Sequence, residues 1–384
     1  MKLSCLQENL SPALGVVGRA VATRTTLPIT QNVKISTDQS RLRLAATNLE
    51  IAISTWIGAQ IEEEGAITVP ARLLTELVGS LPAERIDIET TTQPTALSVN
   101  CARFDAQING TDAEEFPPIP EVESGLAGKI DPQVLNKAIT HVAFAAATED
   151  SRPVLTGVQV ELTGDDFTFA GADGFRLAVY KGKLLEPISE DVTFIIPARS
   201  LQEVSRVLTG SSETVEFTVT PSKSQALFKL ENIEIVTQLI QGTFPNYSQL
   251  IPQSFDTRAV VNLGEFLGAT RTASIFARDG AGILRLHVTE GTDDAPGKLS
   301  IVSIAEEVGQ NHGAIDAKVE GGEAKVEGGE AKIAFNSKYL ADVLAVLQQD
   351  EVALETTTPS SPGVLRPVGS DSYVHVVMPM FVQW

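Results

Sequence analysis

The chain of 384 residues is 43% hydrophobic and 20% charged, and its length suits two or three domains with cores of their own. A formal net charge of −20 opposes nucleic-acid binding unless the few bases are gathered on one surface. No window approaches the ~18 apolar residues of a membrane-spanning helix, and the N-terminus lacks the apolar core of a signal peptide. Two cysteines, Cys5 and Cys101, are typical of a reducing compartment. We therefore expect a cytoplasmic globular protein with no membrane partner.

Two kinds of periodicity predict the elements. Apolar residues at helical spacing, such as Leu10, Leu14 and Val17, predict helices, and alternation with period two, as in Ile86-Asp87-Ile88-Glu89, predicts half-buried strands. In chain order the main predicted elements are helix 8–24, strands 34–36 and 41–44, helix 70–80, strand 86–89, helices 132–147 and 197–209, strand 214–219, and helices 263–278 and 336–349.

The sequence also repeats itself at long period. Val69-Pro70-Ala71-Arg72 returns as Ile196-Pro197-Ala198-Arg199 and, more weakly, as Phe335-Asn336-Ser337-Lys338. In each copy an apolar run leads to a helix start, and the base stands four residues before an acid, a spacing that supports a helix. Proline-rich segments after Glu115 and Thr243 end the first two copies. The fold class is therefore α+β, with three similar domains (1–120, 121–253 and 254–384), each with two helices packed on antiparallel sheet.

Charge is distributed unevenly between the helices and the rest of the chain. The six predicted helices carry nine bases (Arg19, Arg24, Arg72, Lys137, Arg199, Arg206, Arg271, Arg278 and Lys338) and five acids (Glu8, Glu76, Glu203, Glu265 and Asp342). They sum to +4 and leave −24 on the remainder. Chance explains this bias as well as function does when it is taken alone. Together with the repeat it favours two chains whose helices line a hole, where DNA is held topologically by weak, sequence-independent phosphate contacts.

One polar stretch, 291–331, breaks the pattern. Within it, Lys318-Val319-Glu320-Gly321-Gly322-Glu323-Ala324 is followed at once by a second copy of the same seven residues. We expect an exposed loop that grew by duplication, because loops tolerate added length at little entropic cost. The pattern predicts no function for it.

Catalytic and metal-binding patterns are missing from the sequence. The four histidines, His141, His287, His312 and His375, show no ligand spacing, and no Gly-Lys pair continues into the Ser or Thr of a phosphate-binding loop. The sequence around Asp173-Gly174 suits a turn better than a metal carboxylate. We expect no enzymatic activity, no cofactor and no metal.

Six motifs, in order along the whole chain, resemble those of the bacterial DNA polymerase III beta subunit family, the sliding clamps. They are Arg24-Thr25-Thr26-Leu27-Pro28-Ile29, Thr47-Asn48-Leu49-Glu50, Val69-Pro70-Ala71-Arg72, Asp173-Gly174-Phe175-Arg176-Leu177-Ala178, Phe244-Pro245-Asn246-Tyr247 and Val376-Val377-Met378-Pro379-Met380. The resemblance implies a DNA-clamp architecture in which a homodimer forms a closed ring around duplex DNA. It implies as partners the polymerase III catalytic subunit, the clamp loader and other proteins that carry a clamp-binding motif.

The resemblance also implies one peptide pocket per chain, between the second and third domains. Carried over by position, its residues are Leu155, Gly174, Arg176, Leu177, Pro245, Leu250, Val376, Met378, Pro379 and Met380. A surface rich in Met and Leu suits varied apolar side chains, as a shared docking site requires. The alternative for Leu155 and Leu177 is an ordinary core role.

Several positions depart from the family pattern. Phe175 stands where a histidine often occurs, Gln249 where an arginine occurs, and Pro153-Val154 where aromatic DNA contacts occur. The chain also continues past Met380 as Phe381-Val382-Gln383-Trp384. These differences affect the expected partner preference more than the existence of the pocket.

Candidate DNA and interface residues follow from the same resemblance. Arg24 carries over directly to DNA contact, and Arg72, Arg152 and Arg199 follow by position and charge, with a solvated side chain as the alternative for each. The ring interface is expected at Phe104, Ile275 and Phe276, although a strand-core role for Phe104 is the competing interpretation.

Two other function classes stay open at this stage. A repeat-built interaction scaffold would never depend on DNA, and a hydrolase with an unrecognised acid pair would turn over nucleic-acid or glycan substrates. Ring opening by charge substitution at Ile275 and Phe276 separates a clamp from a scaffold, and an activity screen separates either from a hydrolase.

Overall fold

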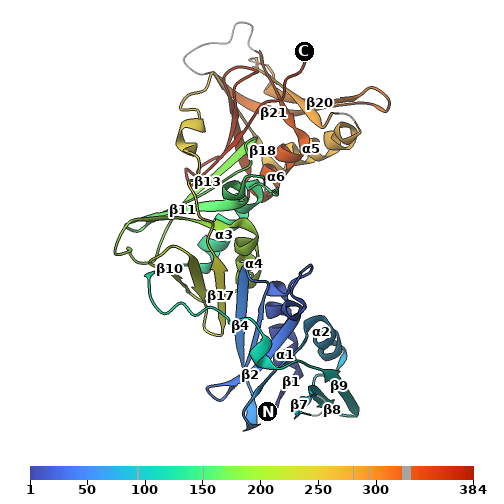
Figure 1. Ribbon diagram of the computed structural model, residues 1–384. Helices are drawn as coiled ribbons and strands as arrows, with labels where there is room; N and C mark the ends of the chain where they lie inside the picture. Colours follow the sequence, from blue (N-terminus) through green and yellow to red (C-terminus); the bar gives the residue numbers. More distant parts are fainter. Residues whose placement is uncertain (93–94, 150, 280, 293, 322–329) are drawn as a thin grey trace. The chain divides into compact units, whose positions relative to one another are not determined.

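The computed structural model describes residues 1–92, 95–149, 151–279, 281–292, 294–321 and 330–384 (Figure 1). Most of the duplicated heptad lies outside these residues. The expectation of an exposed loop over 291–331 is wrong for the described part of that stretch, most of which forms strands (Gly297–Ala305, Gly309–Gly321 and the start of Glu330–Asn336). The chain forms two compact units. The first unit comprises Met1–Asn136, Leu184–Glu190 and Arg199–Ile240, and the second comprises Lys137–Lys183, Asp191–Ala198 and Gln241–Trp384.

All six predicted helices are present in the described part of the chain, although those predicted over 132–147 and 336–349 end five and three residues early. They are α1 (Gln7–Val17), α2 (Ala71–Ser80), α3 (Pro132–Val142), α4 (Ala198–Leu208), α5 (Leu263–Arg278) and α6 (Ser337–Val346).

The end of the first helix was predicted wrongly. The α-helix stops at Val17, a short 3-10 turn covers Gly18–Ala20, and Val21 is already extended, with φ −73° and ψ 131°. Glycine at position 18 is a poor helix former, so the apolar spacing does not carry the helix further. Arg19 and Arg24 therefore lie outside the α-helices, whose remaining seven bases and five acids leave a net charge of +2 instead of +4.

The first unit contains two antiparallel sheets. The five-stranded sheet has the order β5 (Gln60–Glu63), β1 (Lys2–Leu6), β7 (Arg85–Thr92), β8 (Thr95–Cys101) and β9 (Phe104–Asn109). The eight-stranded sheet has the order β10 (Leu126–Ile130), β15 (Val215–Val219), β16 (Gln225–Lys229), β17 (Ile233–Gln238), β4 (Ile51–Gly58), β3 (Arg41–Thr47), β2 (Asn32–Asp38) and β6 (Ala66–Pro70).

Helices α1 and α2 pack on one face of this larger sheet, against β2, β3 and β4. The alternation along β3 explains which face they cover, because Leu42 and Leu44 are buried while Arg41 and Arg43 on the other face are not. Leu10 and Leu14 of α1 complete this core from the helix side.

The second unit is built on one antiparallel sheet of twelve strands. Its order is β14 (Val192–Pro197), β11 (Gly157–Thr163), β12 (Asp166–Ala172), β13 (Arg176–Lys183), β25 (Tyr373–Val377), β24 (Gly363–Pro367), β23 (Glu351–Thr356), β18 (Thr257–Asn262), β21 (Gly309–Gly321), β20 (Gly297–Ala305), β19 (Ile283–Thr289) and β22 (Glu330–Asn336). Helices α5 and α6 pack against each other, and α5 lies on β19, β20 and β21.

Two strand pairs join segments that are distant in sequence in the same manner. In the first unit β4 pairs antiparallel with β17, from Ile51↔Thr237 to Thr55↔Ile233. In the second unit β13 pairs antiparallel with β25, from Arg176↔Val377 to Tyr180↔Tyr373. In both cases the strand lies directly after a turn and pairs with a much later strand. The sheets thus continue across the predicted domain limits, whose positions at 120/121 and 253/254 stay predictions.

Candidate peptide pocket and charged surfaces

The pocket begins at the turn that leads into β13. One carboxylate oxygen of Asp173, Oδ1, accepts hydrogen bonds from the backbone N–H groups of Phe175 (2.9 Å) and Arg176 (3.0 Å). Gly174 between them has φ of +93°, a conformation that glycine adopts without strain. The expectation of an Asp-Gly turn at this position is confirmed, and it places Phe175 at the surface, with 60% of its area exposed.

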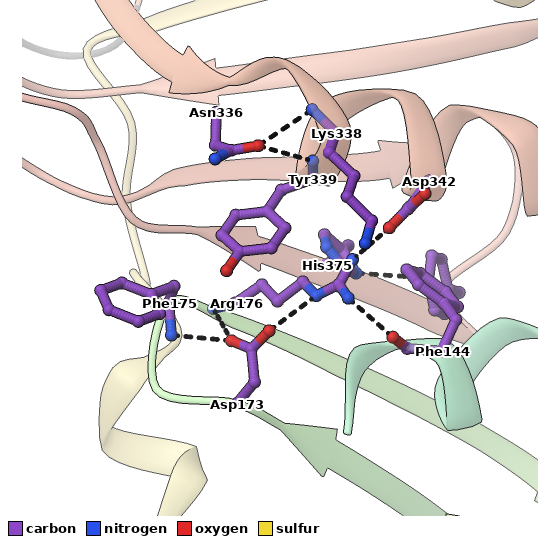
Figure 2. Close-up of polar contacts among 10 residues, drawn as sticks. Phe144, Asp173, Phe175, Arg176, Asn336, Lys338, Tyr339, Asp342 and His375 are labelled. Carbon is purple, nitrogen blue, oxygen red and sulfur yellow. Dashed lines mark hydrogen bonds and ion pairs between the residues drawn. The ribbon is translucent and has the colours of Figure 1, made fainter. Parts of the chain in front are cut away.

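Arg176 lies beneath this turn and is only 9% exposed. Its Nε donates to Asp173 Oδ2 (3.0 Å), its Nη1 to Asp342 Oδ2 (2.7 Å) and its Nη2 to the backbone oxygen of Phe144 (2.8 Å), as Figure 2 shows. A buried guanidinium needs such partners, because an uncompensated buried charge is costly. The three bonds tie β13, α6 and the 3-10 turn after α3 together.

An aromatic wall stands beside the arginine. The guanidinium carbon lies 4.6 Å from the ring centroid of Tyr339 and 5.3 Å from that of Phe144, both within the range of cation–π attraction. Tyr339 in turn stacks on Phe175, with centroids 6.4 Å apart and planes inclined by 23° (Figure 2). The side chain of Asn336 caps α6 at its start by accepting from the N–H groups of Lys338 (2.9 Å) and Tyr339 (3.4 Å).

These residues line a cavity of about 490 Å³ in the second unit. Its wall consists of Ala146, Ala147, Thr148, Glu149, Ser151, Arg152, Leu155, Asp173, Gly174, Phe175, Arg176, Lys338 and Tyr339. The volume is within the range of small-ligand and peptide-anchor pockets, which are mostly apolar with a few fixed polar groups.

Three of the predicted pocket residues, Leu155, Gly174 and Arg176, line the cavity. Leu177 and Val376 are buried and pair with each other across β13 and β25. Met378 follows β25, and its N–H donates to the Phe175 oxygen over 2.8 Å. Strand pairing therefore carries the residues after β25 to the turn that forms the cavity.

The other predicted pocket residues lie on neighbouring segments and not in the wall of this cavity. Pro379 and Met380 are half-buried, and the Met380 N–H donates to the Ala334 oxygen (2.7 Å). Pro245 and Leu250 are exposed on the segment that follows β17. The Tyr247 hydroxyl anchors that segment by donating to Glu161 (3.0 Å). Burial, with the nearby Glu161 charge, raises the pKa of Tyr247, so the phenol keeps the proton that it donates. Peptide contact by each of these residues stays a prediction.

Reasoning from the sequence missed Tyr339, Lys338 and Asp342 as parts of the site. Lys338 and Asp342 were recognised only as the base and acid of the third repeat copy. A signal was present in the repeat, because Lys338 and Asp342 take the positions of Arg199 and Glu203 at a repeated helix start. Which segment this helix start would meet was not indicated by the repeat.

The predicted DNA-contact arginines lie in different local settings. Arg24 is exposed in the loop after α1, and Arg72 and Arg199 are exposed as the second residues of α2 and α4. Arg72 donates to Glu76 over 2.8 Å. Arg152 is exposed too, but it lines the pocket, where its Nη1 would lie 3.3 Å from a Cβ at position 174.

Acidic Glu203 on α4 is partly neutralised by two arginines. Arg19 lies 3.6 Å from Glu203 Oε2, and Arg206 pairs with Glu203 Oε1. The three side chains together therefore carry a net charge of +1.

The predicted interface residues lie on the edge strand β9 and on helix α5, and two of the three are exposed. Phe104 begins the edge strand β9 and is 58% exposed, and Ile275 on α5 is 57% exposed. Phe276 is half-buried and packs near Gly309 at the end of the β20–β21 hairpin. Two further exposed residues of that hairpin, Ile304 and Val308, extend the apolar surface and were not predicted.

Two histidines are buried behind the pocket. Burial, followed by the Arg176 charge, lowers the pKa of His375 to about 3, and burial lowers that of His141 to about 4. His375 Nδ1 lies 3.1 Å from the Tyr373 hydroxyl, while its Nε2 has no hydrogen-bond partner among the described residues. Both rings are therefore neutral and belong to the core.

Neither a metal-binding cluster nor a membrane-spanning helix occurs among the described residues. No cluster of three His, Cys, Asp or Glu side chains there could hold a metal ion. None of the helices formed by those residues is long and apolar enough to cross a bilayer.

Comparison with known proteins gives full-length matches. Family models of the DNA polymerase III beta subunit match as its N-terminal domain at residues 1–120, its central domain at 129–246 and its C-terminal domain at 248–381. The beta sliding clamps of Bacillus subtilis and Synechococcus elongatus are 30% and 31% identical, each over 99% of both chains. The crystal structure of the Bacillus subtilis sliding clamp superposes with a TM-score of 0.91 over 100% of both chains, at 30% identity. That of the Pseudomonas aeruginosa beta subunit reaches 0.88 at 26% identity, again over the whole of both chains. The chain therefore belongs to the DNA polymerase III beta subunit family, the bacterial beta sliding clamps, which are non-catalytic processivity subunits of the polymerase.

Proposed function

We propose that two copies of this chain close head to tail into a ring around duplex DNA and that the pocket captures peptide segments of replication and repair proteins. The proposed partners are the polymerase III catalytic subunit, the clamp loader and other proteins with a clamp-binding motif. The single observation that carries the ring is the repeated strand junction, β4 with β17 and β13 with β25.

Two free strand edges support a third junction of the same kind between copies. β9 pairs only with β8 among the described strands, and residues 309–316 of β21 pair only with β20. An unpaired edge is a template for another strand. The edge strand β9 of one copy would pair with the free edge of β21 in the other copy. This strand pairing would close the ring in the same way that β4–β17 and β13–β25 pairing joins the domains within a chain.

Side chains at the two edges are complementary. The apolar surface of Ile275, Phe276, Ile304 and Val308 faces solvent in a single chain, which suits burial against Phe104 of a second copy. Arg103 precedes Phe104, whereas Glu306 and Glu307 lie at the hairpin tip beside Val308. Opposite charges at the rim of an interface favour the correct register.

The helix starts support a role in holding phosphate. The helix dipole disfavours a base in the first helical turn, which offsets part of the support that the acid four residues after Arg72 and after Arg199 gives to the helix. A helix N-terminus and an exposed arginine together attract phosphate. Arg24 lies in the loop after α1 and is proposed as a further DNA contact. Arg152 lines the pocket, so we rank it below the other three arginines as a DNA contact.

Two further proposals complete this assignment. We place the domain limits at 1–120, 121–253 and 254–384, supported by the repeat and by the Asn262 cap that begins α5. We also propose a cytoplasmic location, which the two buried, unpaired cysteines Cys5 and Cys101 support.

The deciding experiment compares retention on circular and linear DNA. The protein is loaded on a nicked circular plasmid by a clamp loader and isolated by gel filtration before and after the plasmid is cut once. The ring predicts retention on the closed circle and loss by sliding off the ends after cutting. Equal retention before and after cutting contradicts topological binding, and no DNA association in either state favours a scaffold that does not encircle DNA.

A further inference from the structure

We infer that Arg176 is a positioning residue, which fixes the aromatic wall of the pocket from below and does not itself bind the partner peptide. The inference rests on the proposed peptide-binding function and assigns a role within it. It departs from the peptide contact that family position alone suggests for this arginine.

The first step is that the guanidinium is already occupied. Of its five N–H donors, one each on Nε, Nη1 and Nη2 is bonded to Asp173, Asp342 and the Phe144 oxygen. Its faces lie against Tyr339 and Phe144. A peptide carboxylate would have to displace one of two carboxylates that are already close and partly desolvated, which is unfavourable.

The second step is what the arginine holds. Asp173 belongs to the turn that presents Phe175, and Asp342 lies one helical turn after Lys338 on α6, the helix whose first residues carry Tyr339. Arg176 therefore links the turn and the helix start directly (Figure 2). Tyr339 packs on the guanidinium, and Phe175 packs on Tyr339. The buried arginine therefore fixes the position of the exposed Phe175 ring through Tyr339.

The third step is which residues are left to recognise the partner. Phe175 is exposed and presents an apolar face, and Arg152 and Lys338 are exposed bases in the cavity wall. Apolar and acidic features of a peptide would therefore meet these three residues. A preorganised wall improves affinity, because less conformational entropy is lost when the peptide binds.

The test uses Asp342→Asn, because Asp342 is bonded to Arg176 but does not line the cavity. The probe is a fluorescein-labelled peptide with the clamp-binding segment of the polymerase III catalytic subunit from the same genome, measured by fluorescence polarisation. Positioning predicts an affinity about tenfold weaker, since the wall loses its support. Direct peptide contact predicts the opposite sign, because a freed guanidinium would bind the peptide more tightly.

A second readout needs no peptide. The chain has four tyrosines, so labelling with 3-fluorotyrosine gives four ¹⁹F resonances, and Tyr339→Phe assigns one of them. Positioning predicts that Asp342→Asn and Arg176→Met both shift or broaden the Tyr339 resonance and leave that of Tyr247 in place. Asp166→Asn, which breaks the exposed pair with Lys183 (2.8 Å), is the matched control and should change neither readout.

The outcomes separate cleanly. An unchanged Tyr339 resonance in both variants, or tighter peptide binding by Asp342→Asn, overturns the positioning role. If the wild-type protein does not bind the peptide at all, the proposed pocket function fails instead, and the resonances still decide what Arg176 positions.

Discussion

Leu49 and Gly174 occupy the same position in two equivalent turns, with φ values of +77° and +93°. In the first turn Asn48 Oδ1 accepts from the N–H groups of Glu50 (3.0 Å) and Ile51 (2.9 Å), as Asp173 Oδ1 does for Phe175 and Arg176. Both turns lead into the strand that forms a long-range junction. A leucine in the left-handed region is strained where glycine is not.

We expect Leu49→Gly to raise the free energy of unfolding by about 1 kcal/mol, because it removes this strain. Leu49 is 54% exposed, so little burial is lost. Urea denaturation, followed by a spectroscopic signal from the first unit, measures the change in the free energy of unfolding. Leu185→Gly is the control, since Leu185 is equally exposed but is not at a positive φ, and it should destabilise or have no effect. A destabilised Leu49→Gly would show that the turn needs the leucine.

Ile275→Asp should separate the proposed dimer into single chains of 40.9 kDa, because an unpaired carboxylate would be buried at the apolar surface. We expect the dissociation constant to rise about 100-fold. Sedimentation equilibrium gives the mass, with Leu185→Asp as an exposed control. A single-chain mass for the unaltered protein at micromolar concentration would count against the ring.

Removal of residues 378–384 should abolish peptide binding and leave the dimer intact. The deletion takes away the Met378 bond to Phe175 and the Met380 bond to Ala334, next to the pocket, but no residue of the proposed interface. Fluorescence polarisation and sedimentation report the two properties separately. Unchanged peptide affinity in the shortened chain refutes the assignment of Met378, Pro379 and Met380.

Arg199→Gln should weaken DNA binding equally for all sequences. If the arginine contacts one phosphate, the slope of log affinity against log salt falls by about 0.9. The slope is measured on a short duplex at several salt concentrations. Lys183→Gln is the control, because Lys183 is an exposed base held by Asp165 and Asp166 outside the helices. Equal slopes for the two variants would remove Arg199 from the proposed DNA surface.

The protein should lose stability on acidification because His375 stays neutral when folded. Its folded pKa of about 3 lies below the unfolded value of about 6.5, so the unfolded chain takes up a proton first as pH falls. The stabilisation is complete above pH ~6.5 and is lost as pH falls toward about 3. His375→Phe should lower the slope of unfolding free energy against pH in this window by about 1.4 kcal/mol per pH unit. Urea titrations between pH 7 and 4 measure it, and a slope equal to wild type would contradict the assignment. His312→Gln, at an exposed histidine, is the control.

Much of the fold could be predicted because its signals are local. Helical spacing located all six helices, and alternation located strands such as β2, β3, β7 and β15 within a few residues. The end of α1 was predicted too late, because the apolar spacing continues through Val21 although the α-helix ends before Gly18. The motif order and the repeat identified the family.

The sequence by itself determined the repeat, the element types, the family and a list of pocket residues. Only the tertiary structure decided that Arg176 meets Asp342, 166 residues away, that Tyr339 forms the wall beside Phe175, and that Arg152 lies in the pocket. Periodicity records which face of an element is buried, but it holds no record of which distant element covers that face. The pairing of β13 with β25 supplies that information, and it brings the two halves of the pocket together.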